Sequence, residues 1–334
     1  MHKFCPDLHS RGIFIAYLQI VVIDNEMRII KKQFSFDRDL DNVRTFLLDV
    51  YNQTGELHYL LPTRIENQKY GPCGPEYSPE DDEAIKIWIT SDSDDSDIIA
   101  ISHRGSSANY HIEIHPNYKH LERELFQEIE KLESSIVGKQ RSRMYMYHVG
   151  PDVKRADVLR DMNYEEYGPH EYNYAVPKDT QVPNNPPPEG FEIRSLRGEQ
   201  DYSQFIEVVG AAYDHCRQHM TIDKMKFMTE AEFYHQDLNL VVVDEEERFV
   251  AFCMYRLDPL TQIAEMETVD VHPDYKNLGL ESALVSVGIR RVRKHQPNQI
   301  YAVEVDVSDP QNQLLENAGF VRAVTMNMWG KTIN

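Results

Sequence analysis

The sequence predicts an α/β (α+β) protein built from two tandem copies of one domain, and three observations support this. The chain has 334 residues, which is enough for two domains of ordinary size that each bury a core. Segments with the apolar pattern of strands alternate with segments that have the pattern of helices. Residues 114–121 recur at 271–278, and residues 158–164 recur at 314–320, with offsets of 157 and 156 residues. A nearly constant offset indicates a duplicated domain.

Composition restricts the class of function. The chain is 41% hydrophobic and 27% charged, which is typical of a soluble globular protein. Its net charge of −20 argues against binding to nucleic-acid phosphates and favours cationic partners or amine substrates. An acidic surface that only keeps a protein soluble explains the same charge, so the charge does not choose an acceptor.

The four cysteines are scattered along the chain and form no C-x-x-C pair. They are Cys5, Cys73, Cys216 and Cys253. This spacing predicts reduced thiols and a cytoplasmic location, and it favours neither a disulfide framework nor a zinc site.

Residues 1–25 are predicted to form an N-terminal extension. Its apolar run, 12–23, is interpreted as a strand or as part of a poorly ordered extension. The run is too short to span a bilayer, and Asp24 follows it without a cleavage pattern of small residues. We therefore expect no membrane segment here.

The first copy is predicted to span 26–176. It begins with a strand at 26–36, and a helix with one apolar face follows Asp37. The apolar residues of that face are Leu40, Val43, Phe46, Leu47 and Val50. The segment 51–79 predicts a long loop, or a short helix with irregular flanks, of the kind that shapes a binding mouth. Further strands are expected at 84–90, 98–103 and 110–114, and a helix at 121–136.

An acidic turn at 91–97 invites a calcium-binding interpretation. A calcium loop of the EF-hand type requires glycine at its sixth position and glutamate at its twelfth. Counted from Asp92, those positions hold Asp97 and His103. We therefore interpret the turn as a solvated hairpin and predict no metal site.

The second copy is predicted to span 191–334, after a stiff, extended, proline-rich linker at 177–190. Strands are expected at 191–196, 238–244, 248–257, 263–271, 300–307 and 321–329. Helices are expected at 202–216, 221–234 and 311–317, and after Leu278.

The strongest functional signal lies at 271–284. A strand ends at Val271, the chain turns at Pro273 and passes Gly279, and an amphipathic helix follows. The unpaired N–H groups at such a helix start can hold a phosphate. The first copy has lost this glycine, because Glu122 stands in its place and Glu124 follows, and their carboxylates would repel phosphate.

This stretch resembles the acyl-CoA-binding signature of the GNAT superfamily of N-acyltransferases, in which a strand ending V-x-P is followed by R/Q-x-x-G-x-G/A. Val271, Pro273 and Gly279 match it, whereas Lys276 replaces Arg or Gln and Glu281 replaces Gly or Ala. The resemblance covers 191–329 well and 26–176 more faintly. It implies two tandem GNAT-like domains, each with a mixed, mostly antiparallel twisted sheet flanked by helices, of which the N-terminal one is degenerate.

The resemblance also implies acetyl-CoA as co-substrate. In the family, the loop N–H groups hold its diphosphate, and the main chain of the preceding strand holds its pantetheine arm. The corresponding residues here are Val269, Val271, Lys276, Asn277, Leu278, Gly279, Leu280, Glu281 and Ser282. Lys276 offers a point charge without the two-pronged geometry of arginine. The carboxylate of Glu281 would compete with phosphate for the positive end of the helix.

Catalysis requires a general base and a proton donor for the leaving thiolate. The family position of the base, six residues before Val271, is Glu265, and on a regular strand Glu267 shares its face. The usual tyrosine donor is replaced by Leu315, and Ser308 replaces the asparagine of the same pattern. A water, a water oriented by Asn312, or a tyrosine from another element would then donate the proton.

The sequence thus predicts an N-acetyltransferase that modifies a primary amine of a small molecule or peptide in its C-terminal domain, as a monomer or homodimer. The alternative is a non-catalytic GNAT-fold module for CoA sensing or protein interaction. A dinucleotide-binding enzyme is not supported, because no G-x-G-x-x-G follows a strand. A serine hydrolase is not supported either, because G-x-S-x-G is absent from the sequence.

Overall fold

The computed structural model describes residues 18–22, 28–55, 60–90, 97–105, 108–138, 142–150 and 152–333. Of the predicted N-terminal extension, Leu18–Val22 forms strand β1, and the rest of that prediction lies outside the described residues. The predicted acidic turn also lies outside them, apart from Asp97.

The strands of the described residues join into one sheet. Its order is β1-β2-β3-β4-β5-β6-β13-β7-β12-β11-β10-β9-β8. In the N-terminal half, β2 is Arg28–Gln33, β3 Ile85–Thr90, β4 Ile98–Arg104, β5 Asn109–Ile114, β6 Ser142–Val149 and β7 Glu165–Ala175. In the C-terminal half, β8 is Glu192–Ser195, β9 Asn239–Val243, β10 Phe249–Leu257, β11 Ile263–Val271, β12 Gln299–Asp306 and β13 Val321–Ile333. Only the β5–β6 and β11–β12 pairings of these strands are parallel, so the predicted mixed, mostly antiparallel sheet is confirmed.

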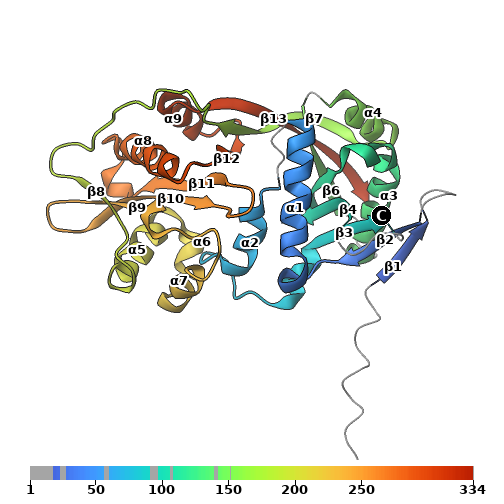
Figure 1. Ribbon diagram of the computed structural model, residues 1–334, viewed down its shortest axis with the longest axis horizontal. Helices are drawn as coiled ribbons and strands as arrows, with labels where there is room; N and C mark the ends of the chain where they lie inside the picture. The colour runs from blue at the N-terminus through green and yellow to red at the C-terminus, as the bar shows by residue number, and fades with distance from the viewer. Residues whose placement is uncertain are drawn as a thin grey trace, which may run out of the picture.

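The two halves exchange their last strands. Strand β13 pairs with β6 of the N-terminal half, and β7 pairs with β12 of the C-terminal half. The two exchanged strands also pair with each other along most of their length. Each half therefore completes the sheet of the other (Figure 1). The domain limits drawn from the sequence, at 176 and 191, stay predictions.

Helices cover both faces of the sheet. In the N-terminal half, α1 is Phe36–Thr54, α2 Pro62–Tyr70, α3 Glu122–Val137 and α4 Val153–Asp161. In the C-terminal half, α5 is Glu199–Ala212, α6 Asp214–Arg217, α7 Ile222–Met228, α8 Leu280–Val292 and α9 Gln311–Ala318. Figure 1 shows α8 and α9 on one face of the C-terminal strands and α5, α6 and α7 on the other. The apolar face predicted for the first helix is buried in α1, which confirms that prediction.

The proline-rich segment 177–190 contains neither helix nor strand and lies along α8. Arg290 donates to the carbonyl of Pro183 at 2.9 Å, and the amide of Asn185 donates to the hydroxyl of Ser282, also at 2.9 Å. Side-chain hydrogen bonds therefore hold the segment against the helix, and the predicted stiff, extended linker stays a prediction.

The prediction of reduced thiols is wrong for one pair of cysteines. Cys73, in the loop after α2, forms a disulfide with Cys216 in α6, although 143 residues separate them. The spacing of the cysteines in the sequence could not reveal this pair, because the two residues come close only where the folded halves meet. Cys253 is free and buried. None of the described helices is long and apolar enough to cross a membrane.

Candidate functional site

Strands β11 and β12 diverge after a short parallel contact. They pair only where 263–265 meets 299–301, and no further pairing follows among the described residues. The divergence leaves a cavity of about 390 Å³, which we call the splay cavity. Its lining is Val269, Asp270, Asn277, Gly279, Glu281, Ser282, Pro310, Gln311 and Leu314.

The start of helix α8 opens onto the splay cavity. Gly279 precedes the helix with a φ of 80°, which favours glycine, and no side chain caps the helix there. A Cβ at this position would meet no atom within 4 Å, so the space beside the backbone is open. The first N–H groups of α8 have no partner within the helix, so they are available to an anion.

The structure brings five of the predicted cofactor residues into the lining of the splay cavity. These are Val269, Asn277, Gly279, Glu281 and Ser282. Val271 and Leu280 are buried in the core of the C-terminal half, whereas Lys276 and Leu278 are exposed on the turn.

Asn312 lies outside this lining. Its amide donates to the carbonyls of Asp306 and Asp309, each at 2.8 Å, and its oxygen accepts from the Tyr174 hydroxyl at 2.8 Å. The side chain therefore fixes the start of α9 with both N–H groups of its amide, and its oxygen already accepts one hydrogen bond.

The neighbouring residue, Gln311, is a site residue that the sequence interpretation missed. Its amide donates to the carbonyl of Val269 at 3.3 Å, across the splay. Leu315, at the position of the usual tyrosine, is buried in the core, and the described lining of the splay cavity includes no tyrosine. The described lining of the splay cavity thus offers no tyrosine acid, and Tyr174, which donates to Asn312, lies outside it.

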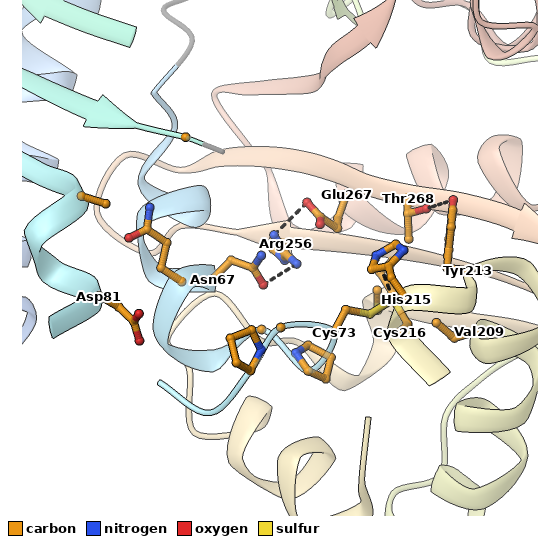
Figure 2. A pocket seen from close by; sticks show the side chains of 18 of the residues that line it. Asn67, Cys73, Asp81, Val209, Tyr213, His215, Cys216, Arg256, Glu267 and Thr268 are labelled. Carbon is orange, nitrogen blue, oxygen red and sulfur yellow. Dashed lines mark hydrogen bonds and ion pairs between the residues drawn. A yellow bond between two sulfur atoms is a disulfide. The ribbon is translucent and has the colours of Figure 1, made fainter. Parts of the chain in front are cut away.

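A second cavity, of about 630 Å³, lies between the two halves, and we call it the interhalf cavity (Figure 2). Its C-terminal lining includes Tyr213, His215, Met254, Arg256, Glu267 and Thr268, and its N-terminal lining includes Asn67, Gln68, Asp81, His103 and Arg104. The Cys73–Cys216 disulfide forms part of the wall. The two cavities meet β11 at neighbouring residues, because 267–268 line the interhalf cavity and 269–270 line the splay cavity.

A β-bulge places Glu267 at the interhalf cavity. Met254 lies opposite Thr268 and Tyr255 lies opposite Met266, so Glu267 is the extra residue of β11. Its carboxylate accepts from Arg256 at 2.8 Å, and its side chain is 24% exposed. Arg256 also donates to Asn67 of α2 at 2.7 Å, as the dashed lines of Figure 2 show.

Glu265, the other predicted catalytic carboxylate, lines neither cavity. It is fully buried, and it accepts from the Thr63 hydroxyl and from the Arg64 guanidinium, both at 2.6 Å. Both donors belong to α2, so this ion pair joins the N-terminal half to β11. The two glutamates therefore have different surroundings, which their spacing in the sequence did not reveal.

Neutral hydrogen-bonding groups complete the interhalf cavity. The Tyr213 hydroxyl lies 2.8 Å from Oγ1 of Thr268, and burial raises the pKa of Tyr213, which keeps that hydroxyl protonated. Burial, together with the charge of Arg64, lowers the pKa of His103 to about 4. The imidazole is therefore neutral at pH 7, and its Nε2 lies 2.6 Å from the amide of Gln68.

Residues 206–320 match the model of the Acetyltransferase (GNAT) family. The match runs from α5 through α9 and includes β11, its bulge and the turn into α8. These residues form a GNAT domain. This match supports acyltransferase activity in general.

Solved structures extend the likeness to both halves. A GCN5-related N-acetyltransferase from Sphaerobacter thermophilus is 14% identical with a TM-score of 0.63, over 92% of this chain and 96% of that one. A tandem GNAT protein from the clavulanic acid biosynthesis pathway is 11% identical with a TM-score of 0.62, over 92% of this chain and 99% of that one. No curated protein has a matching sequence. At these identities the likeness shows the fold, and the chain has the tandem GNAT fold that the repeat and the resemblance together predicted.

Proposed function

We propose that the protein is an N-acetyltransferase that transfers the acetyl group of acetyl-CoA to a primary amine at β11 of the GNAT domain. One observation carries this proposal: two cavities meet at neighbouring residues of β11 beside the bulged Glu267, and one of them contains the uncapped start of α8. A transferase needs separate access for donor and acceptor to one reacting point, and this arrangement provides both.

The residues of the splay cavity suit acetyl-CoA. The N–H groups from Leu280 to Ser282 would hold its diphosphate, with Lys276 adding a positive charge from the exposed turn. The main chain of Val269 would pair with its pantetheine arm, and Gln311 would have to release the Val269 carbonyl for this to occur. Bound there, acetyl-CoA supplies the activated acyl group.

The acceptor amine would enter through the interhalf cavity. Its neutral nitrogen forms the C–N bond with the acetyl carbon, the C–S bond breaks, and CoA leaves as a thiolate that takes a proton. Glu267 accepts the proton of the amine, directly or through one water. Because no tyrosine belongs to the described lining of the splay cavity, a water protonates the thiolate. Glu265 then has a positioning role, since it holds α2 against β11.

Isothermal titration of acetyl-CoA tests the donor site. We expect binding by the wild type and none by Gly279→Trp, whose side chain would fill the cavity at the helix start. Gly55→Trp is the matched control, because Gly55 also has a positive φ, of 65°, with no atom within 4 Å of an added Cβ, and it lies at the end of α1. Absence of binding by the wild type would refute the proposal.

The second candidate is a non-catalytic GNAT-fold module that binds CoA or a protein. The burial of Leu315 at the acid position and the hydrogen bond from Gln311 to Val269 favour it. A panel of amines with a free-thiol readout separates the two candidates. CoA release that falls by about 100-fold or more in Glu267→Gln supports the enzyme. Binding of acetyl-CoA without release on any amine supports the module.

The cytoplasmic location stays a prediction, and it has lost its main argument. Scattered reduced cysteines suggested it, whereas the structure pairs Cys73 with Cys216, and disulfides are rare in the cytosol. The predicted monomer or homodimer is likewise untested, and size-exclusion chromatography with light scattering would decide between them.

A further inference from the structure

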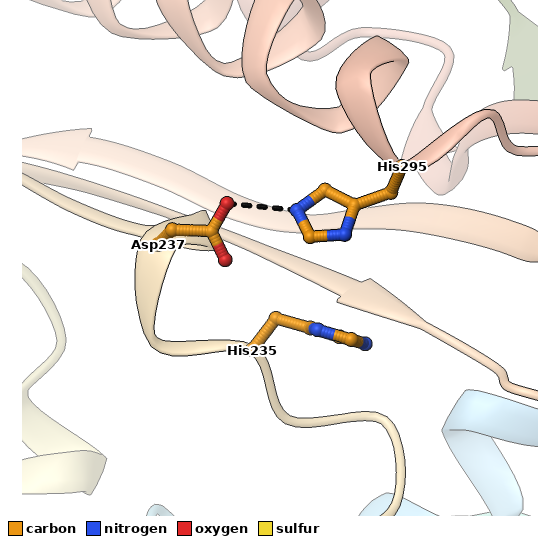
Figure 3. Close-up of side chains that lie close together, drawn as sticks. All are labelled: His235, Asp237 and His295. Carbon is orange, nitrogen blue, oxygen red and sulfur yellow. Dashed lines mark hydrogen bonds and ion pairs between the residues drawn. The ribbon is translucent and has the colours of Figure 1, made fainter.

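Two histidines and an aspartate come together at the far end of α8 from the splay cavity. His235 and Asp237 belong to the chain around the 3-10 turn η4, Gln236–Leu238, and His295 ends the turn η6, Arg293–His295, which continues α8. One ligand atom from each of the three lies within 4.8 Å of the others. Figure 3 shows Asp237 and the ring of His295 pointing toward each other, with the ring of His235 beside them.

The three side chains of this cluster lie close together. Nε2 of His295 lies 2.7 Å from the carboxylate of Asp237, and the two imidazole rings meet edge to face with centroids 5.0 Å apart. Ligand atoms bound at about 2.1 Å to one tetrahedral ion are separated by roughly 3.4 Å. Small rotations of the three side chains would reach that spacing.

The backbone that carries the cluster is fixed. The amide of Asn239 donates to the carbonyl of His235 at 2.8 Å, and the amide of Gln236 donates to the carbonyl of Leu196 at 2.8 Å. Arg291 of α8 donates to the carbonyl of Asp237 at 3.1 Å. The ligands would therefore be held by elements that other contacts already position.

We propose that His235, Asp237 and His295 bind one divalent transition-metal ion, with Zn²⁺ as the occupant that this ligand set suits. Two imidazoles and one carboxylate are a common zinc set, and a fourth position remains for water. The side chains of His295 and Asp237 are 26% and 54% exposed, which leaves a path for the ion.

A metal ion binds an imidazole in its neutral form. The guanidinium of Arg291 is a cation nearby, and it opposes the ion, so we expect micromolar rather than tighter affinity.

This site is separate from the proposed acyl-transfer chemistry. Helix α8 has 13 residues, so its two ends lie about 20 Å apart at 1.5 Å per residue. An ion here would join η4, at the start of β9, to the end of α8. It would stabilise the GNAT domain without touching the splay cavity.

Metal titration of the oxidised, tag-free full chain tests the proposal. Zn²⁺ is measured in competition with a chromogenic chelator, and Co²⁺ by its visible absorption. We expect one Zn²⁺ per chain with micromolar Kd, and tetrahedral Co²⁺ bands that Zn²⁺ displaces. His235→Asn and His295→Asn should each weaken Zn²⁺ binding by at least about tenfold, and circular dichroism without metal checks that both variants fold.

His115→Asn is the matched control. His115 pairs with Asp49 at 3.0 Å. Like His295 and Asp237, they form a His–Asp pair, but among the described residues no third metal-binding side chain completes the group. We expect this variant to bind Zn²⁺ as the wild type does. Equal affinity in wild type and His235→Asn, or no binding by the wild type at 1 mM Zn²⁺, would overturn the proposal.

Discussion

The two halves of the chain contain the same turn after corresponding strands, but only the C-terminal turn opens onto a sizeable cavity. His115 has φ −55° and ψ 135°, and His272 has φ −54° and ψ 136°. In each, Nδ1 accepts from the N–H two residues later, at 3.2 and 3.3 Å. The chains then diverge, because Gly279 takes a left-handed conformation where Glu122 is helical.

The N-terminal half fills the space that the C-terminal half leaves open. The carboxylate of Glu122 accepts from the buried Arg155, which also donates to the carbonyl of Ile112 at 3.2 Å. In the C-terminal half, Gln311 makes the corresponding bond to Val269. The cavity in this part of the N-terminal half measures about 20 Å³, against about 390 Å³ for the splay cavity. In the N-terminal half, an internal ion pair thus occupies the place that corresponds to the proposed diphosphate site of the C-terminal half.

The first prediction breaks this ion pair. Arg155→Met should lower the free energy of unfolding by about 3–5 kcal/mol, because it leaves the carboxylate of Glu122 buried without its cation. Gln311→Met, at the corresponding position, should cost only about 1 kcal/mol, since it removes one neutral hydrogen bond. Urea unfolding measures both.

The paired replacement provides the control. Glu122→Leu combined with Arg155→Met should recover most of the loss, because it removes both charges from the interior. If Arg155→Met cost no more than Gln311→Met, the ion pair would not be what holds the N-terminal cavity closed.

The second prediction concerns the covalent link between the halves. Reduction of Cys73–Cys216 should lower the free energy of unfolding by about 2–4 kcal/mol, because the bond closes a long loop of the unfolded chain. Urea unfolding with and without dithiothreitol measures this. A Cys73→Ser, Cys216→Ser double variant should be insensitive to dithiothreitol. Equal sensitivity of variant and wild type would show that the reductant acts elsewhere.

The third prediction concerns a variant in which the turn before α8 receives the residue found in the corresponding turn before α3. Gly279→Glu places in the C-terminal half the residue that the N-terminal half has at Glu122. We expect acetyl-CoA to bind about 100-fold more weakly, which is about 2.7 kcal/mol, since the side chain strains the backbone and its charge repels phosphate. Titration calorimetry measures the change, and Gly55→Glu controls for the strain alone. Undiminished affinity would place the diphosphate elsewhere.

The fourth prediction compares the first helices of the two halves. In each, a buried aspartate, Asp39 or Asp201, accepts from a main-chain N–H four residues earlier and from arginine. Burial alone would raise the pKa of Asp201, but hydrogen bonds from Arg194 and Arg197 outweigh it and lower the pKa to about 2. A carboxyl with a lowered pKa stabilises the fold above its unfolded value of 3.8, and the contribution disappears as the pH falls toward 2.

Asp201→Asn should therefore cost about 2 kcal/mol at pH 7, and the cost should shrink below pH 4. Urea unfolding across this range measures it. Asp39→Asn should follow the same direction, since the pKa of Asp39 is also lowered. A cost for Asp201→Asn that stays constant from pH 7 to pH 3 would exclude the ionised carboxyl as its source.

The fold was predictable from the sequence as far as local patterns reach. The repeat at 114–121 and 271–278 revealed the two copies, and periodicity located most helices and strands. The exchange of β7 and β13 was not predictable, because β7 was not expected as a strand and the apolar pattern of β13 does not show with which half it pairs. The predicted helix at 221–234 was too long, since α7 ends at Met228.

The candidate site also has one part that the sequence could predict and one that it could not. The splay cavity was largely predictable, because most of its lining comes from one continuous stretch, 269–282. The interhalf cavity was not, since Asn67, His103 and Arg256 meet only in the folded chain. Nor did spacing reveal the bulge at Glu267, which separates the surroundings of the two glutamates.

The last prediction tests whether the carboxylate of Glu281 weakens the binding of an anion at the start of α8. Glu281 lines the splay cavity, and its carboxylate competes with phosphate for the positive end of the helix. Glu281→Ala should therefore tighten acetyl-CoA binding by about two- to fivefold at low salt, with less effect at high salt. Glu124→Ala, the corresponding change in the N-terminal half, should leave the affinity unchanged. Weaker binding by Glu281→Ala would mean that this carboxylate helps to hold the ligand, and that the departure from the family signature is an adaptation of the site.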